Sequence, residues 1–176
     1  MAICLAVHTK VADVVACRDD ARMLHLPLRL AYRTAHLGLR AYWRIRKPET
    51  QGALAVIFCR GQLLVLQTTY RDAVSLPGGY VKKGETPEVA VAREVREEVG
   101  FNVEPGAFKH VYRGTKPFEH RKDTLDLFRL ELDARPVIKT NRAEIAWARW
   151  KSPEEVLAMP NVVPHLRDYL SSLKDE

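Results

Sequence analysis

Three glutamates, Glu94, Glu97 and Glu98, lie within five consecutive positions of the chain. In a helix, side chains three and four residues apart share one face, so these carboxylates would gather within a single turn. Such a cluster repels itself and favours a cation. Carboxylate oxygens in this number suit Mg²⁺ or Mn²⁺, which keep several waters and take substrate phosphate oxygens as further ligands. The spacing therefore predicts a metal site that acts on a phosphate ester or anhydride.

The surrounding residues predict the helix that this spacing requires. Thr86 suits the N-cap, Pro87 the first helical position and Gly100 the position just past the end, so the helix should cover residues 87–99. An apolar stripe on another face can pack against the protein while the carboxylates stay accessible; it consists of Val91, Ala92, Val95 and Val99. Plain solvated surface is the alternative interpretation of a helix face rich in glutamate.

A longer pattern surrounds the three glutamates. It consists of a glycine, five residues, a glutamate, seven residues and then Arg-Glu-apolar-any-Glu-Glu-any-Gly-apolar. Every position is filled, by Gly79, Glu85, Arg93, Glu94, Val95, Glu97, Glu98, Gly100 and Phe101. At residue frequencies of roughly 5–7% each, a chance match is on the order of one in ten million, which favours a metal site over plain surface. The stretch resembles the signature of the Nudix (MutT-like) hydrolases.

The resemblance implies a role for each of these residues. Glu94, Glu97 and Glu98 would be the ligands of Mg²⁺ or Mn²⁺. Glu85 and Arg93 would form an ion pair that braces the loop before the helix and would not contact the substrate. Two glycines would complete this structural support, Gly79 and Gly100. Members of the family cleave nucleoside diphosphates linked to another moiety.

The implied reaction is attack of water on a diphosphate phosphorus, assisted by the metal, and it needs a general base. Glu97 and Glu144 are the candidates for this catalytic role. In the family a further glutamate often precedes the tryptophan of a late strand, and Glu144 lies six residues before Trp150. Three alternatives stay open for this position, namely Asp123, Glu119 and plain surface.

Four residues outside the helix are candidates for substrate binding. Arg71 lies in a polar loop, while Phe118, His120 and Arg121 lie in the basic segment 115–122, which we expect to be a loop between two strands. This composition can contact phosphate and stack on a base. A solvated hairpin tip is the alternative. The substrate stays open among ADP-ribose, a nucleotide sugar and related nucleotides.

The composition of the 176 residues, 47% hydrophobic and 28% charged, is that of one globular domain. A net charge of +6 suits an anionic substrate, and it would equally suit nucleic acid or an acidic membrane surface. Cys4, Cys17 and Cys59 are widely spaced and form no C-x-x-C pair. This argues against a disulfide framework or a zinc site and predicts a reducing compartment, the cytoplasm.

Three segments are expected along the chain. Residues 1–23 lack the features of a signal peptide and would be a leader that is disordered or an artefact of start-site choice. Residues 24–47 predict a basic amphipathic helix, and residues 48–176 the Nudix hydrolase domain. The helix would pack on that domain or on a second subunit in a homodimer, or its residues 28–47 would associate weakly with an anionic membrane surface. It lacks a motif that reads nucleic acid, so no specific nucleic acid partner is expected.

The order of the expected elements places the chain in the α/β class. Apolar runs compatible with strands occur at residues 53–58, 63–67, 108–114 and 124–132, and a terminal helix is expected over residues 162–173. The resemblance implies an α/β/α sandwich around a mixed β-sheet, preceded by the N-terminal helix. The alternative function is a Nudix-like module that binds nucleotide, or docks on a membrane, without hydrolysis. No glutamate of the signature is lost, which favours an enzyme.

Overall fold

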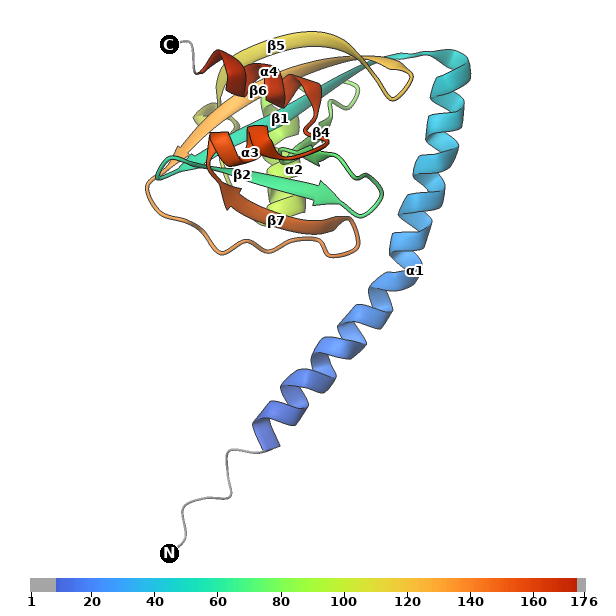
Figure 1. Cartoon of the computed structure of the whole chain (residues 1–176), viewed down its shortest axis with the longest axis vertical. Coiled ribbons are helices and arrows are strands. Elements are labelled where there is room, and N and C mark those ends of the chain that lie inside the picture. Colours follow the sequence, from blue (N-terminus) through green and yellow to red (C-terminus); the bar gives the residue numbers. More distant parts are fainter. Residues whose placement is uncertain (1–8, 174–176) are drawn as a thin grey trace, which may run out of the picture.

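A mixed β-sheet forms the centre of the molecule (Figure 1). The structure is a computed structural model that describes residues 9–173, with side chains from residue 26 onward. The strands are β1 (Glu49–Cys59), β2 (Gln62–Thr68), β3 (Val74–Ser75), β4 (Gly78–Tyr80), β5 (Lys109–Phe118), β6 (Arg121–Leu132) and β7 (Ile145–Lys151). Their order is β3-β2-β1-β6-β5, with β4 paired to β1 and β7 paired to β2. β1 and β6 run parallel, and the other pairs are antiparallel.

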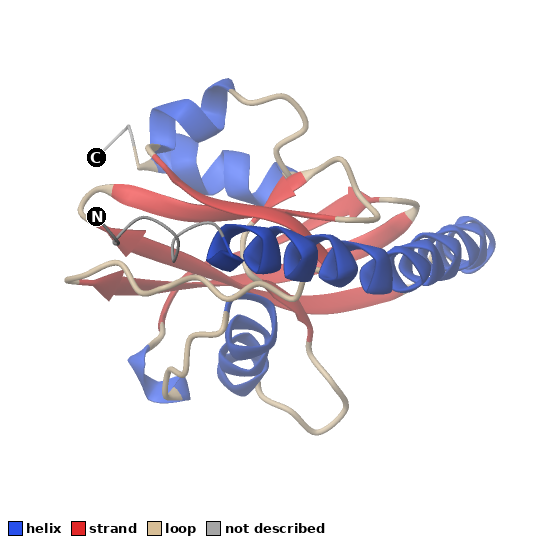
Figure 2. Ribbon diagram, turned by 90° about the horizontal axis from the view of Figure 1, so that it is seen from below, coloured by secondary structure: helices blue, strands red, loops and turns tan. Residues whose placement is uncertain are grey.

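Helices cover both faces of this sheet (Figure 2). α2 (Pro87–Val99) lies on one face, and α3 (Pro153–Ala158) and α4 (Pro164–Ser172) lie on the other. The short 3-10 helix η1 (Pro105–Ala107) follows α2, whereas α1 (Thr9–Arg46) extends away from the sheet (Figure 1). One apolar core fills the space between α2 and the sheet, and a second lies between the sheet and the pair α3 and α4. The α/β/α sandwich with a mixed sheet and a preceding N-terminal helix is confirmed.

Helix α2 has the bounds that its caps predict. The Thr86 hydroxyl accepts a hydrogen bond from the Val89 N–H at 3.4 Å. Gly100 adopts a left-handed conformation with φ of 78° and donates its N–H to the Arg96 carbonyl. The predicted apolar stripe is buried against the sheet together with Ala90. One carboxylate of the cluster, that of Glu98, is buried as well.

The hairpin between β5 and β6 corrects one expectation. The segment 115–122 is not a loop, because the two strands stay paired as far as Phe118 and Arg121. Only Glu119 and His120 form the turn, and both have left-handed φ angles, of 46° and 69°. This is the geometry of the two-residue turns that match the twist of antiparallel strands. The pairing therefore decides which side chains of this segment can reach the site.

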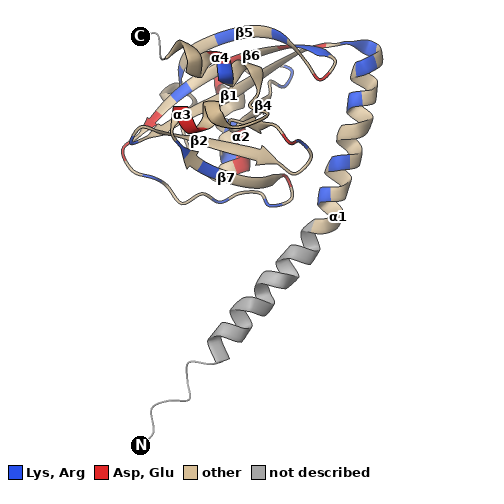
Figure 3. Ribbon diagram, viewed as in Figure 1, with Lys and Arg blue, Asp and Glu red and all other residues tan. Residues whose placement is uncertain are grey.

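Helix α1 begins earlier than expected, at Thr9, and contains Pro27. The prediction for residues 1–23 stays a prediction, since residues 1–8 lie outside the described residues and only the backbone is described for 9–25. Among residues 26–46, only His36 and Trp43 are buried. Arginines are distributed along the described part of the helix (Figure 3). Among the described residues, no helix combines the length and the apolar character that a membrane span requires.

Candidate active site

A cleft of about 290 Å³ lies at one edge of the sandwich. Two groups of side chains line it. The first is acidic and comprises Glu94, Glu98 and Glu144, and the second is basic and aromatic, with Arg71, Phe118 and Arg121. Tyr70 links them, because its hydroxyl lies 3.5 Å from Glu144 Oε1 and its ring centroid lies 5.5 Å from the Arg71 guanidinium carbon.

Glu98 reaches the cleft from the buried side of α2. Its Oε2 accepts a hydrogen bond from the Gly78 N–H at 2.8 Å. Burial raises the pKa of this carboxyl well above its ordinary value, and the charges of Glu94, Glu144 and Glu97 raise it further. A buried carboxylate among like charges is unfavourable unless a cation offsets the repulsion. This arrangement fits a divalent cation.

Gly79 leaves the space that the Glu94 carboxylate occupies. A Cβ atom added to Gly79 would lie 2.6 Å from Glu94 Oε1 and 2.7 Å from its Cδ. The same oxygen accepts a hydrogen bond from Arg93 Nη1 at 2.6 Å. A glycine is therefore required at position 79, because the Glu94 carboxylate approaches the backbone there too closely for a Cβ atom.

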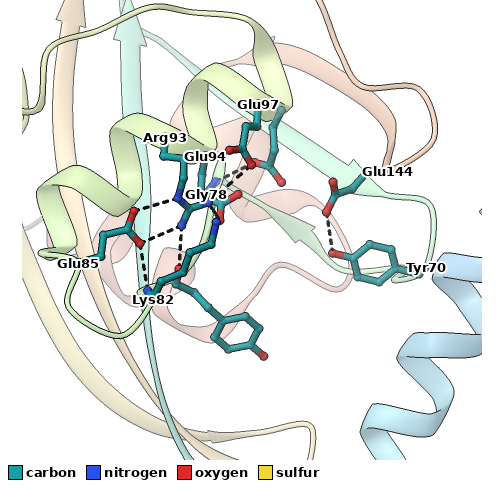
Figure 4. Close-up of polar contacts among 10 residues, drawn as sticks. Tyr70, Gly78, Lys82, Glu85, Arg93, Glu94, Glu97 and Glu144 are labelled. Atoms are coloured by element: carbon teal, nitrogen blue, oxygen red, sulfur yellow. Dashed lines mark hydrogen bonds and ion pairs between the residues drawn. The ribbon is translucent and has the colours of Figure 1, made fainter.

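Arg93 and Glu85 form the ion pair that the resemblance implies (Figure 4). Arg93 donates from Nε to Glu85 Oε1 at 2.9 Å and from Nη2 to Glu85 Oε2 at 3.0 Å. Nη2 also donates to the Tyr80 carbonyl at 3.1 Å, and the Lys82 N–H donates to Glu85 Oε2 at 3.0 Å. Hydrogen bonds from Arg93 lower the pKa of Glu85 to about 2. The loop before α2 is thus tied to the middle of that helix.

Glu97 lies nearer to solvent than its neighbours. Its side chain is 52% exposed, and its Oε2 is 3.6 Å from Arg93 Nη1. Within the described part of the chain, no three acidic, histidine or cysteine side chains converge closely enough to hold a metal ion as they stand. Arg93 Nη1 contacts both Glu94 and Glu97. The donor set nevertheless matches an oxygen-preferring cation, because its carboxylates share one helix face.

Glu144 faces the glutamates of α2 from the loop before β7. The loop is fixed to β2 by a backbone hydrogen bond of 2.7 Å from the Thr69 N–H to the Glu144 carbonyl. Burial raises the pKa of the Glu144 carboxyl, and the charges of Glu94 and Glu97 add to the rise. The structure therefore brings Glu144 together with the α2 carboxylates, as the predicted role requires.

The two alternatives to Glu144 are engaged elsewhere. Asp123 is buried and accepts hydrogen bonds from Arg121 Nη2 at 3.1 Å and from Thr50 Oγ1 at 2.7 Å. Glu119 Oε2 pairs with Arg71 Nη2 at 3.1 Å. Each carboxylate therefore serves the basic group of the cleft and not the acidic one.

The substrate-binding candidates divide into three that line the cleft and one that does not. Arg71, Phe118 and Arg121 line it. His120 is exposed at the tip of the β5–β6 turn and lies outside the lining, so its role in substrate binding stays a prediction. His120 belongs to the two-residue turn, whereas Phe118 and Arg121 are paired strand residues.

Several lining residues were not predicted from the sequence. Tyr70 directly precedes Arg71, but no spacing marks it, and its contact with Glu144 depends on the pairing of β2 and β7. His165 lies at the start of α4, is buried and lines the cleft. Neither of its ring nitrogens has a hydrogen-bond partner of good geometry, although one lies near the Asp123 backbone carbonyl. Only the fold brings this residue to the cleft.

Comparison with known proteins agrees with this fold. The NUDIX domain model matches residues 49–173. A MutT-like protein from Streptomyces ambofaciens is 33% identical over 98 residues, which is 54% of this chain and 58% of that protein. The phosphatase NudJ of Escherichia coli K12 is 29% identical over 118 residues, 66% of this chain and 76% of that protein. The chain belongs to the Nudix hydrolase family.

Solved structures share the fold at lower identity. The MutT protein from Methanosarcina mazei superposes with a TM-score of 0.64 at 24% identity, over 74% of this chain and 96% of that one. An Ap4A hydrolase from Caenorhabditis elegans gives a TM-score of 0.60 at 17% identity, over 72% of this chain and 96% of that one. The NUDIX domain of NrtR from Shewanella oneidensis, in complex with ADP ribose, gives a TM-score of 0.61 at 16% identity, over 72% of this chain and 88% of that one.

Proposed function

We propose that the protein hydrolyses the diphosphate linkage of a nucleoside diphosphate joined to another moiety, in a reaction that depends on Mg²⁺ or Mn²⁺. The observation that carries this proposal is the division of the cleft. Glu94, Glu98 and Glu144 form its acidic group, and Arg71 and Arg121 form its basic group. A diphosphate with a bound cation is complementary to both groups.

Glu94, Glu97 and Glu98 are the proposed metal ligands. The bound cation would supply Lewis acidity toward the phosphate oxygens and toward the attacking water. Arg93 holds Glu94 and Glu97 on the same side of α2. The hydrogen bond from the Gly78 N–H fixes one oxygen of Glu98 and leaves the other for a ligand role. These residues keep the carboxylates aligned before the substrate arrives.

Glu144 is the proposed general base, with Glu97 as the alternative. Glu144 lies in the cleft wall opposite α2, and the Tyr70 hydroxyl orients its carboxylate. Glu97 lies outside the cleft lining and is half exposed. A base must reach the attacking water from beside the phosphorus, which favours the residue that faces the cleft.

The basic group would hold the rest of the nucleotide. The guanidinium carbons of Arg71 and Arg121 lie 6.0 Å and 5.6 Å from the centroid of the Phe118 ring. Guanidinium groups recognise phosphate by paired hydrogen bonds, and an aromatic ring provides a face for a nucleobase. ADP-ribose, a nucleotide sugar and a dinucleoside polyphosphate all have this chemistry. The solved relatives named as an Ap4A hydrolase and as an ADP ribose complex support this range.

The direct test is a panel of ADP-ribose, UDP-glucose, diadenosine tetraphosphate and nucleoside triphosphates, assayed for product release with Mg²⁺, with Mn²⁺ and with EDTA. We expect turnover that requires the metal. Glu144→Gln should lower kcat about 10²–10⁴-fold if Glu144 is the base, and Glu97→Gln by a similar or larger factor if Glu97 binds the metal. Glu88→Gln in the first turn of α2 is the matched control, because Glu88 does not line the cleft.

The outcomes separate the proposals. Near-normal turnover in Glu97→Gln would refute its role, and turnover in EDTA would refute the need for a metal. If no compound of the panel is cleaved while the wild-type protein still binds Mn²⁺ and ADP-ribose, the non-hydrolytic nucleotide-binding module becomes the preferred function.

The outer face of α1 supports a second prediction, association with an anionic membrane surface. Several large apolar side chains are exposed there beside the arginines; they are Leu26, Leu28, Leu30, Leu37, Leu39, Tyr42 and Ile45. Such a mixture suits an acidic lipid surface or the same face of a second subunit. Sedimentation with phosphatidylserine vesicles at low salt tests the first, and sedimentation velocity tests the homodimer. The absence of both would leave the face as plain solvated surface.

A further inference from the structure

The inner face of α1 meets the catalytic domain along one stripe. Four of the described side chains contact the domain, those of Arg29, Tyr32, His36 and Trp43, spaced by three, four and seven positions. This spacing places them on one face of a helix. His36 and Trp43 are 7% and 3% exposed, while their neighbours Leu37 and Tyr42 are 62% and 53% exposed. The stripe is therefore the face by which α1 packs on the catalytic domain, and it is more buried than the neighbouring positions of the helix.

The partners of this stripe belong to the cleft or touch its lining. The Tyr32 ring stacks on the Tyr70 ring, with centroids 6.1 Å apart and planes inclined by 12°. The His36 ring lies 5.0 Å from the same Tyr70 ring. Tyr70 is the residue whose hydroxyl meets Glu144. These two α1 side chains thus pack against the group that orients the proposed general base.

The same stripe supports the basic group of the cleft. The Arg121 guanidinium carbon lies 4.1 Å from the centroid of the Trp43 ring, a cation–π distance. His36 Nε2 lies 3.3 Å from Glu119 Oε1, and Glu119 Oε2 pairs with Arg71 at 3.1 Å. Both arginines that line the cleft are therefore held from behind by α1, one directly and one through Glu119.

From these contacts we propose that α1 is part of the active site, with Tyr32, His36 and Trp43 as positioning residues that fix Tyr70, Arg71 and Arg121 for the nucleotide portion of the substrate. No residue of the described part of α1 lines the cleft itself, so α1 acts through the residues that do. This inference rests on the proposed function and extends it to a helix outside the matched family domain, which begins at residue 49.

The physical argument is strongest for Trp43 and Arg121. The Arg121 side chain is only 3% exposed, and its Nε and Nη1 atoms have no hydrogen-bond partner. Trp43 provides one wall of its enclosure, with Tyr80 and Phe118 at 5.4 Å and 5.6 Å as the other aromatic neighbours. Removal of the Trp43 ring would open that enclosure to water and let the guanidinium take other rotamers. The ordering of Arg121 would then have to be supplied by substrate binding, which weakens affinity.

The test compares Trp43→Ala with Tyr42→Ala, its exposed neighbour in the same helix, in the full-length protein. With the best substrate of the panel, Trp43→Ala should raise KM about tenfold, equivalent to ~1.4 kcal/mol, with kcat changed much less. Tyr42→Ala should leave both constants at their wild-type values. Trp43→Phe keeps an aromatic face and should recover most of the lost affinity. His36→Ala, with Leu37→Ala as its control, should act in the same direction.

A second readout does not depend on turnover. Calorimetric binding of α,β-methylene-ADP, a non-hydrolysable nucleoside diphosphate, should weaken in Trp43→Ala by the same factor as KM rises. The proposal is overturned if Trp43→Ala and Tyr42→Ala bind the analogue alike. It is equally overturned if Trp43→Ala loses only melting temperature and active fraction, with KM and the analogue affinity unchanged. Failure of the proposed function would be distinct, because the wild-type protein itself would then cleave nothing in the panel.

Discussion

Substitution of Gly79 by alanine tests the proposed metal site separately from the stability of the fold. The new Cβ atom would lie 2.6 Å from Glu94 Oε1, so this oxygen must retreat by about 0.8 Å to reach the 3.4 Å of an ordinary contact. Metal–ligand distances tolerate deviations of only about 0.2 Å. The displacement therefore exceeds the tolerance roughly fourfold, and Glu94 cannot keep both its place and its ligand role.

The expected loss is about 10–100-fold in affinity for Mn²⁺, the range found when support of a ligand is removed. Stability should change by less than about 1 kcal/mol, because the obstacle is the end of a flexible side chain and an alanine restricts the unfolded chain. Both quantities can be measured on one preparation, the first from activity against Mn²⁺ concentration and the second from urea unfolding in EDTA.

Gly106→Ala is the matched control, since a Cβ there meets no atom within 4 Å. It should leave the metal dependence unchanged. The reasoning would be refuted if Gly79→Ala reached half-maximal activity at the wild-type Mn²⁺ concentration with wild-type kcat. A large loss of stability would also contradict it, because the clash would then be carried by the backbone.

Three further predictions concern single contacts. Glu85→Gln should lower the free energy of unfolding at pH 7 by about 1–2 kcal/mol, since the ion pair with Arg93 becomes a hydrogen bond from the charged guanidinium to a neutral amide. Because the wild-type pKa of Glu85 is lowered from 4.5 to about 2, its contribution is complete above pH 4.5 and is lost as pH falls toward 2, so urea unfolding from pH 2 to 7 should show a flatter profile in the variant. Glu98→Gln should stabilise the metal-free protein by removing a buried charge while raising the Mn²⁺ requirement at least about tenfold, and an unchanged Mn²⁺ requirement would refute the ligand role. Leu166→Ala should cost about 2–5 kcal/mol in thermal unfolding, because Leu166 is fully buried in the core beneath α4.

Local signals carried much of what the sequence could predict. Helix α2 matched its expected bounds because Thr86, Pro87 and Gly100 act on the residues beside them. The contact of Glu85 with Arg93 followed from a resemblance that includes this spacing. The features that the sequence did not predict depend on how the strands pair. The segment 115–122 was expected to be a loop because its composition does not specify a two-residue turn, and Tyr70 was missed because its partner Glu144 lies 74 residues away.

The role of α1 was beyond prediction for the same reason. Its amphipathic pattern correctly indicated a helix, but hydrophobicity alone would have buried its leucines. Among residues 26–46 the buried positions are His36 and Trp43, whose partners Glu119 and Arg121 lie more than 70 residues further along the chain. Polar and aromatic docking of this kind depends on the surface that the helix meets, which only the folded domain defines.

The turn between β5 and β6 combines an unfavourable backbone conformation with a charged side chain next to the cleft. Left-handed φ angles cost residues other than glycine roughly 1 kcal/mol or more, and Glu119 and His120 adopt them in succession. Asn-Gly is the pair that such a turn prefers, and here the first position carries a glutamate. The Glu119 carboxylate lies among Arg71, Arg121 and His36. The left-handed turn therefore places a carboxylate between α1 and the basic group of the cleft. The contacts that offset the local cost of the turn at Glu119 therefore include side chains outside the hairpin, His36 of α1 and Arg71.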